Sequence, residues 1–200
     1  MNNIHFRYQC LFILCMTFII PSSMYSQRFK AMGVFGANTA QIDGDTLYGF
    51  KKLGITAGAR LSYSNEKVWD IALEMLYSQR GSSENLFNTN KGRNINLNFI
   101  EWPLIFSIRD WYQESEKYYK VRAEAGLSYG YLFGAEANGY DVSEVLKHDV
   151  SWLLAAGLNF TKRLGISMRY TSSFSNLYDG PRNDIRYKSY FLTFRTEYQF

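Results

Sequence analysis

The sequence contains few cysteines, prolines and histidines, and these shortages exclude several kinds of protein. Its two cysteines, Cys10 and Cys15, both lie near the N-terminus, so no disulfide can stabilise the rest of the chain. Beyond residue 26 the only histidine is His148, and no group of His and Cys has the spacing of a metal site. We therefore expect neither a metal nor a cofactor.

Long apolar runs and concentrated charge are also missing. Beyond the N-terminal segment no run approaches about 18 consecutive apolar residues, so any membrane crossing there must use strands. The formal net charge is only +4 and no basic run occurs, so nucleic acid is not an expected partner. Charged residues make up 20% of the chain, an ordinary share for a folded domain, whereas aromatic residues reach 18%.

Residues 1–26 have the features of a signal peptide. Arg7 is their only Lys, Arg, Asp or Glu, and the apolar run over residues 10–20 is shorter than the ~20 residues that span a bilayer. A polar segment with small residues follows and ends at Ser26. We expect cleavage after Ser26, which leaves residues 27–200 as one exported domain. The alternative is a membrane-anchoring helix.

The rest of the chain alternates between apolar and polar residues with period two, as β-strands with one apolar face do. In 68–80, Trp69 and Leu73 share one face, while Glu74 and Arg80 share the other. The pattern predicts eight strands, of which the first is the weakest. The predicted strands span residues 29–39, 52–64, 68–80, 95–109, 118–133, 150–161, 164–175 and 188–200.

Three features favour a transmembrane barrel over a soluble β-sandwich, which alternates in the same way. Aromatic residues bracket the apolar faces at the spacing of a tilted membrane strand, as Tyr119 and Tyr129 do. Charges of both signs lie in the middle of the polar faces. Short connections such as 64–67 alternate with long ones such as 81–93, although 110–117 is longer than this pattern predicts. The sequence therefore predicts an all-β protein, a closed antiparallel up-and-down barrel of about eight strands in the outer membrane.

The charges on the polar faces are expected to meet inside the barrel. An eight-stranded barrel has room only for side chains, so a structural network of paired charges is favoured over a path for protons or ions. The predicted members of this lumen network are Glu74, Glu101, Arg122, Glu124, Arg169, Arg195 and Glu197.

Pro103 is unexpected within the strand predicted over 95–109. Proline cannot donate a ladder hydrogen bond, and a closed barrel has no edge strand to accept it. We therefore expect a bulge at Pro103. A change of phase within the strand agrees with this, because Ile95 and Leu97 fall on the face opposite to Leu104.

The segment Phe99-Ile100-Glu101-Trp102-Pro103-Leu104 resembles a strand of the PorT-type outer-membrane β-barrel family, in which Glu101 and Pro103 match the motif. Asp149 and the pair Arg169-Tyr170 are similar as well. The resemblance implies an outer-membrane barrel over the whole mature chain. The best-known member of that family is linked to protein secretion across the outer membrane.

The C-terminal Tyr198-Gln199-Phe200 is similar to the aromatic end by which barrel-insertion machinery recognises its clients, with Tyr198 and Phe200 as the signal. We therefore expect that machinery, outer-membrane lipid and other envelope proteins as partners.

The expected function is that of a non-enzymatic outer-membrane barrel that anchors or contacts partners through its long loops, residues 81–93, 135–149 and 175–188. One alternative is a small lipid-modifying barrel enzyme, in which His148 beside Asp149 would supply part of a Ser–His–Asp arrangement. The other is a soluble periplasmic β-barrel that binds an apolar ligand.

Overall fold

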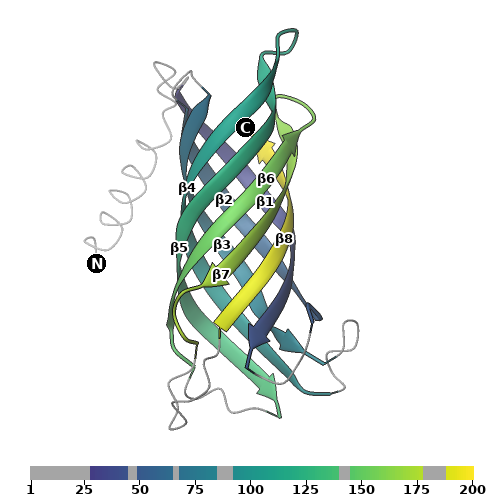
Figure 1. The fold of residues 1–200 in the computed structure, drawn as a ribbon, viewed down its shortest axis with the longest axis vertical. Helices are drawn as coiled ribbons and strands as arrows, with labels where there is room; N and C mark the ends of the chain where they lie inside the picture. Colours follow the sequence, from purple (N-terminus) through teal and green to yellow (C-terminus); the bar gives the residue numbers. More distant parts are fainter. Residues whose placement is uncertain (1–27, 45–48, 65–67, 85–91, 140–144, 178–187) are drawn as a thin grey trace, which may run out of the picture.

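The computed structural model describes residues 28–44, 49–64, 68–84, 92–139, 145–177 and 188–200. They form a closed barrel in which each antiparallel strand is hydrogen-bonded to its sequence neighbours and β1 closes onto β8 (Figure 1). The strands are β1 (Phe29–Asp43), β2 (Lys52–Ser64), β3 (Trp69–Ser83), β4 (Asn94–Gln113), β5 (Tyr118–Asn138), β6 (His148–Asn159), β7 (Leu164–Ser173) and β8 (Lys188–Gln199). The predicted fold class is confirmed. The predicted signal peptide, residues 1–26, lies outside the described residues.

Two ends of the barrel differ in the length of their connections. At one end, only four residues separate β2 from β3, β4 from β5 and β6 from β7, and the start of β1 and the end of β8 lie at the same end. Outer-membrane barrels have short periplasmic turns and longer outer loops. We therefore call this the periplasmic end, which is uppermost in Figure 1, and the opposite one the outer end.

The connection between β4 and β5 is shorter than the sequence indicated. β4 continues to Gln113 and β5 begins at Tyr118, so the turn itself covers only residues 114–117. Trp111 and Lys117 have positive φ angles of 59° and 56°, a backbone conformation that a reversal can require. The interpretation of 110–117 as a long connection is wrong, because the strands extend beyond the part that alternates clearly.

The bulge predicted at Pro103 is also wrong. The β3–β4 register is the same at Leu73↔Leu104 and at Leu76↔Glu101, on either side of the proline. The proline interrupts the ladder because it has no N–H, but it does not shift the register. The register shift lies instead between Asn98 and Phe99, on the β5 side.

Apolar side chains cover the outside of the barrel and polar ones fill most of the inside. On β3, the outward Leu73 is 53% exposed, whereas the neighbouring Glu74 is 1% exposed. Such a surface is suited to lipid and not to water. None of the described residues belongs to a helix long and apolar enough to cross a membrane.

The outer end of the interior is an exception to this polar filling. Six inward apolar side chains pack together there, and three of them come from the start of β4. This cluster, which we call the apolar plug, explains the apparent change of phase in β4: the apolar residues change from the inner to the outer face while the strand keeps its phase. The members of the apolar plug are Ile42, Ile95, Leu97, Phe99, Leu132 and Leu177.

Candidate functional site

The middle of the barrel interior holds a network of buried ion pairs around Glu74. Its carboxylate accepts hydrogen bonds from Arg169 (Nη1 to Oε2, 2.8 Å), from Arg195 (Nη1 to Oε2, 3.0 Å) and from Arg60 (Nη1 to Oε1, 3.3 Å). Glu74 therefore compensates three arginines from three other strands. We call the whole group the central ion network, and its members are Arg60, Glu74, Arg122, Glu124, Arg169, Arg195 and Glu197.

The two other glutamates of the central ion network extend it toward the periplasmic end. Glu124 accepts from Arg60 (Nη1 to Oε1, 2.7 Å) and Arg122 (Nε to Oε1, 2.8 Å). Glu197 accepts from Arg122 (Nη2 to Oε2, 2.5 Å) and forms an ion pair with Arg195 (Nε to Oε1, 2.9 Å). A buried charge is costly unless it is paired and hydrogen-bonded, and here each carboxylate serves at least two arginines.

A second, separate group lies between the central ion network and the apolar plug. Arg80 donates to Glu101 (Nε to Oε1, 2.8 Å) and to Asp149 (Nη1 to Oδ2, 2.6 Å). Its guanidinium carbon lies 4.6 Å from the ring centroid of Phe99 and 4.4 Å from that of Phe191. A guanidinium between two ring faces gains cation–π attraction as well as its ion pairs.

The structure places all seven residues of the predicted lumen network inside the barrel, but in two separate groups and not in one network. Six belong to the central ion network, and Glu101 belongs to the Arg80 group. Sequence reasoning missed Arg60, Arg80 and Asp149 as members. Arg80 was already on the polar face of its strand, so the alternation could have found it.

The remaining predicted residues lie as follows. Pro103 is fully buried on the inner face of β4, in phase with Glu101. Tyr198 and Phe200 lie on the outer face at the periplasmic end, where their rings pack edge to face at 5.8 Å and Phe200 is 79% exposed.

His148 and Asp149 point to opposite faces of β6, because adjacent residues of a strand alternate. Asp149 is buried and paired with Arg80, while the exposed His148 has its Nδ1 2.6 Å from the hydroxyl of Tyr129. A hydroxyl therefore lies beside His148, but Asp149 cannot orient its imidazole as a Ser–His–Asp arrangement requires.

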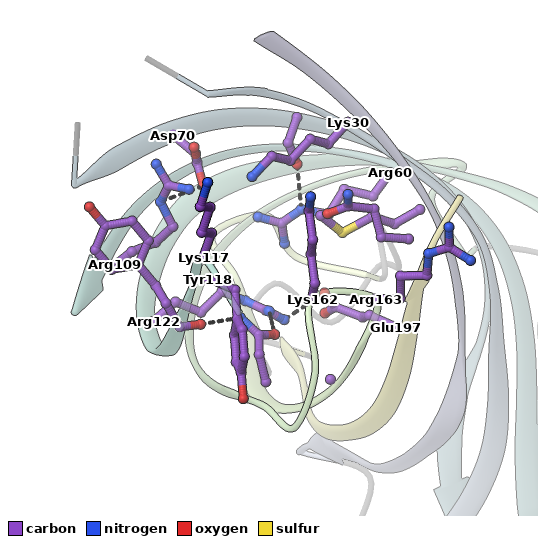
Figure 2. A pocket seen from close by; sticks show the side chains of 16 residues that line it. Lys30, Arg60, Asp70, Arg109, Lys117, Tyr118, Arg122, Lys162, Arg163 and Glu197 are labelled. Carbon is purple, nitrogen blue, oxygen red and sulfur yellow. Dashed lines mark hydrogen bonds and ion pairs between the residues drawn. The ribbon is translucent and has the colours of Figure 1, made fainter. Parts of the chain in front are cut away.

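A cavity of about 120 Å³ opens at the periplasmic end, just beyond the central ion network (Figure 2). We call it the periplasmic pocket. Sequence reasoning missed it, because its lining comes from all eight strands and from two turns. Its charged lining residues among those described are Lys30, Arg60, Asp70, Arg109, Lys117, Arg122, Lys162, Arg163 and Glu197.

Hydrogen bonds hold the wall of the periplasmic pocket in place. Asn159 receives a hydrogen bond from Arg122 (Nη1 to Oδ1, 2.8 Å) and donates one to the carbonyl of Tyr119 (Nδ2 to O, 2.9 Å). Arg109 forms an ion pair with Asp70 (Nε to Oδ2, 3.1 Å) and lies over the Tyr119 ring, 4.7 Å from its centroid. The two arginines thus form a fixed part of the wall.

Comparison with known proteins identifies the class. Residues 21–179 match the family described as "Outer membrane protein beta-barrel domain", and the chain belongs to that family. It is an outer-membrane β-barrel protein of the small eight-stranded type. A search of curated proteins gave no match.

Solved structures with a similar fold have little sequence in common with this chain. Neisserial surface protein A has a TM-score of 0.51 at 12% identity, with 86% of this chain and 97% of that chain covered. Ail of Yersinia pestis in complex with the heparin analogue sucrose octasulfate has a TM-score of 0.48 at 13% identity (86% and 99% covered). OprG from Pseudomonas aeruginosa has a TM-score of 0.44 at 9% identity (86% and 95% covered). At these identities the likeness concerns the fold alone.

Proposed function

We propose that the protein is a sealed, non-enzymatic barrel that acts through contacts with other envelope components at its two ends. One observation carries this proposal: side chains fill the interior from its middle to its outer end. The central ion network, the Arg80 group and the apolar plug follow one another from the middle of the interior to its outer end. Neither paired charges nor a packed apolar cluster leaves a continuous aqueous path, and eight strands enclose little more than their own side chains.

The described ends of the long outer connections support a contact role at the outer end. Leu177 belongs to the apolar plug, Val145 packs against it, and the backbone N–H of Leu146 donates to the carbonyl of Leu177 at 2.8 Å. Two long connections therefore start from a common fixed base. Binding residues are often found on loops that a rigid scaffold positions.

The resemblance to the PorT-type family favours protein secretion across the outer membrane as the setting of these contacts. The motif residue that carries the resemblance, Glu101, pairs with Arg80 in the interior. Its position supports a structural role, so the secretion setting depends on the resemblance and not on a surface.

Conductance tests the sealed interior. We expect the purified protein in a planar lipid bilayer to give no large, steady single-channel currents. A variant with Leu97→Gly and Phe99→Gly, which removes most of the plug side chains of β4, should still lack such currents, because the Arg80 group and the central ion network remain. Porin-like currents from the unaltered protein would contradict the proposal.

Loop shortening tests the contact role. Deletion of residues 85–91 or 140–144 should leave the protein heat-modifiable on a gel but remove proteins that cross-link to it in cells. His148→Ala is the matched variant and should leave both properties unchanged. If His148→Ala alone abolishes function while both deletions have no effect, the lipid-modifying enzyme replaces this proposal.

A further inference from the structure

The periplasmic pocket differs from the rest of the interior because its cations outnumber its carboxylates. Its described lining includes seven Lys or Arg residues but only two carboxylates, Asp70 and Glu197. Both carboxylates are already paired, Asp70 with Arg109 and Glu197 with Arg122 and Arg195. The pocket therefore has positive charge that its own described lining does not neutralise.

Four of these cations make no ion pair within 4 Å among the described residues. They come from different elements: one from β1, one from the β4–β5 turn and two from the β6–β7 turn, as Figure 2 shows. The nearby Asp110, Glu114 and Glu116 belong to the β4–β5 hairpin, are exposed and do not line the pocket. The four cations are Lys30, Lys117, Lys162 and Arg163.

We propose that the periplasmic pocket binds a phosphate-type oxyanion, as the free ion or as the phosphate group of a larger molecule. A concave site with one sign of charge concentrates its field and attracts the opposite charge. A doubly charged tetrahedral anion suits the excess of cations better than a single carboxylate does. The cavity of about 120 Å³ holds several water molecules, and hence one such oxyanion.

The residues divide into a fixed wall and movable ligands. Arg122 already donates to Glu124, Asn159 and Glu197, so it contributes positive potential to the wall and not a direct contact. Lys30 is half-buried on the inner face of β1, and Lys162 is exposed in the β6–β7 turn. Their flexible ammonium groups can close on an anion from two sides, and we assign the direct contacts to them.

The position of the pocket favours a water-soluble source of the phosphate group. Lys30, Asp70 and Arg109 line it from the inner faces of their strands, so the barrel wall separates it from the surrounding lipid. A lipid headgroup would have to bend around the rim to reach it. A soluble phosphate or phosphate ester reaches it directly from the periplasm.

Binding of inorganic phosphate tests the proposal. The folded full-length barrel in a neutral detergent should bind phosphate in isothermal titration calorimetry at low salt, and added sodium chloride should weaken the binding. The double variant Lys30→Gln/Lys162→Gln should bind at least tenfold more weakly. The double variant Lys51→Gln/Lys147→Gln, which removes two exposed lysines at the outer end, should bind like the unaltered protein.

The heat-dependent gel shift shows that each variant is folded. The assignment of the pocket would be wrong if both double variants weakened phosphate binding equally, or if the unaltered, heat-modifiable protein bound no phosphate. Neither result would contradict the proposal of a sealed barrel.

Bilayers of two compositions distinguish the sources. In nanodiscs of phosphatidylcholine alone and in nanodiscs that also contain phosphatidylglycerol, a soluble source predicts the same affinity for phosphate. If the lipid headgroup is the ligand, phosphatidylglycerol should compete and lower that affinity, and the Lys30→Gln/Lys162→Gln variant should abolish the competition. Both outcomes support a phosphate site, and the second reverses our assignment of the source.

Discussion

The central ion network and the periplasmic pocket are neighbouring parts of one interior, yet they differ in how far carboxylates neutralise their cations. In the network four arginines share three glutamates, and every one of these seven side chains is buried. In the pocket, seven cations line a cavity with two carboxylates. The depth of burial explains the difference, since a charge without water must be paired, whereas a charge that water reaches need not be. The loss of any one partner in the network therefore leaves a buried charge uncompensated, whereas the cations of the pocket are free to bind.

Removal of one carboxylate from the network should have the largest effect on stability. Glu74→Gln leaves the charges of Arg60, Arg169 and Arg195 with much less compensation. We expect a loss of roughly 3–5 kcal/mol in the free energy of unfolding, the usual cost of breaking a buried pair. Urea unfolding in lipid vesicles, followed by tryptophan fluorescence, measures it.

Lys162→Gln is the control from the pocket. It removes an exposed charge that has no ion pair among the described residues, so it should change stability by less than about 0.5 kcal/mol. If Glu74→Gln costs no more than Lys162→Gln, the distinction between the two regions is wrong.

A charge on the outer face tests the inside–outside assignment on which this comparison depends. Leu73→Arg and Ala125→Arg place a cation on the outer faces of β3 and β5, against lipid, where the expected cost is roughly 2–4 kcal/mol. Ser128→Arg places it on the buried inner face, where it meets other side chains instead of lipid. Its cost should therefore not depend on bilayer thickness, whereas that of the other two should. The same unfolding assay in vesicles of two chain lengths separates the cases, and equal behaviour of all three variants would show that the faces are misassigned.

The sequence predicted the strands and their faces because alternation is a local property. Glu74, Arg122 and Arg195 were assigned to the interior in this way. It could not predict their partners, since Glu74 and Arg195 are 121 residues apart and meet only once the barrel has closed. The periplasmic pocket was missed for the same reason.

The error at Pro103 has a different origin. The prediction assumed that the inner face is polar throughout, so the apolar Ile95 and Leu97 were taken as a change of phase. They belong to the apolar plug, and the strand keeps its phase. Alternation shows which residues share a face, but it does not show which face is inside where both faces are partly apolar.

A substitution at Gly157 should have the smallest effect on stability among the variants expected to destabilise the barrel. It affects both regions at once, because Arg122, which lies against Gly157, belongs to both. A Cβ at Gly157 would lie 2.7 Å from Nε and 2.8 Å from Cζ of Arg122, so the guanidinium must move. We expect Gly157→Ala to cost about 1–3 kcal/mol, as overpacking does, and less than Glu74→Gln because Arg122 can shift without losing all of its partners.

Gly33→Ala is the matched control, since its Cβ would meet nothing closer than the Phe200 ring at 3.5 Å. Urea unfolding gives the cost, and phosphate titration of the same variants shows whether the wall of the pocket has moved. If Gly157→Ala resembles Gly33→Ala in both measurements, Arg122 does not connect the two regions.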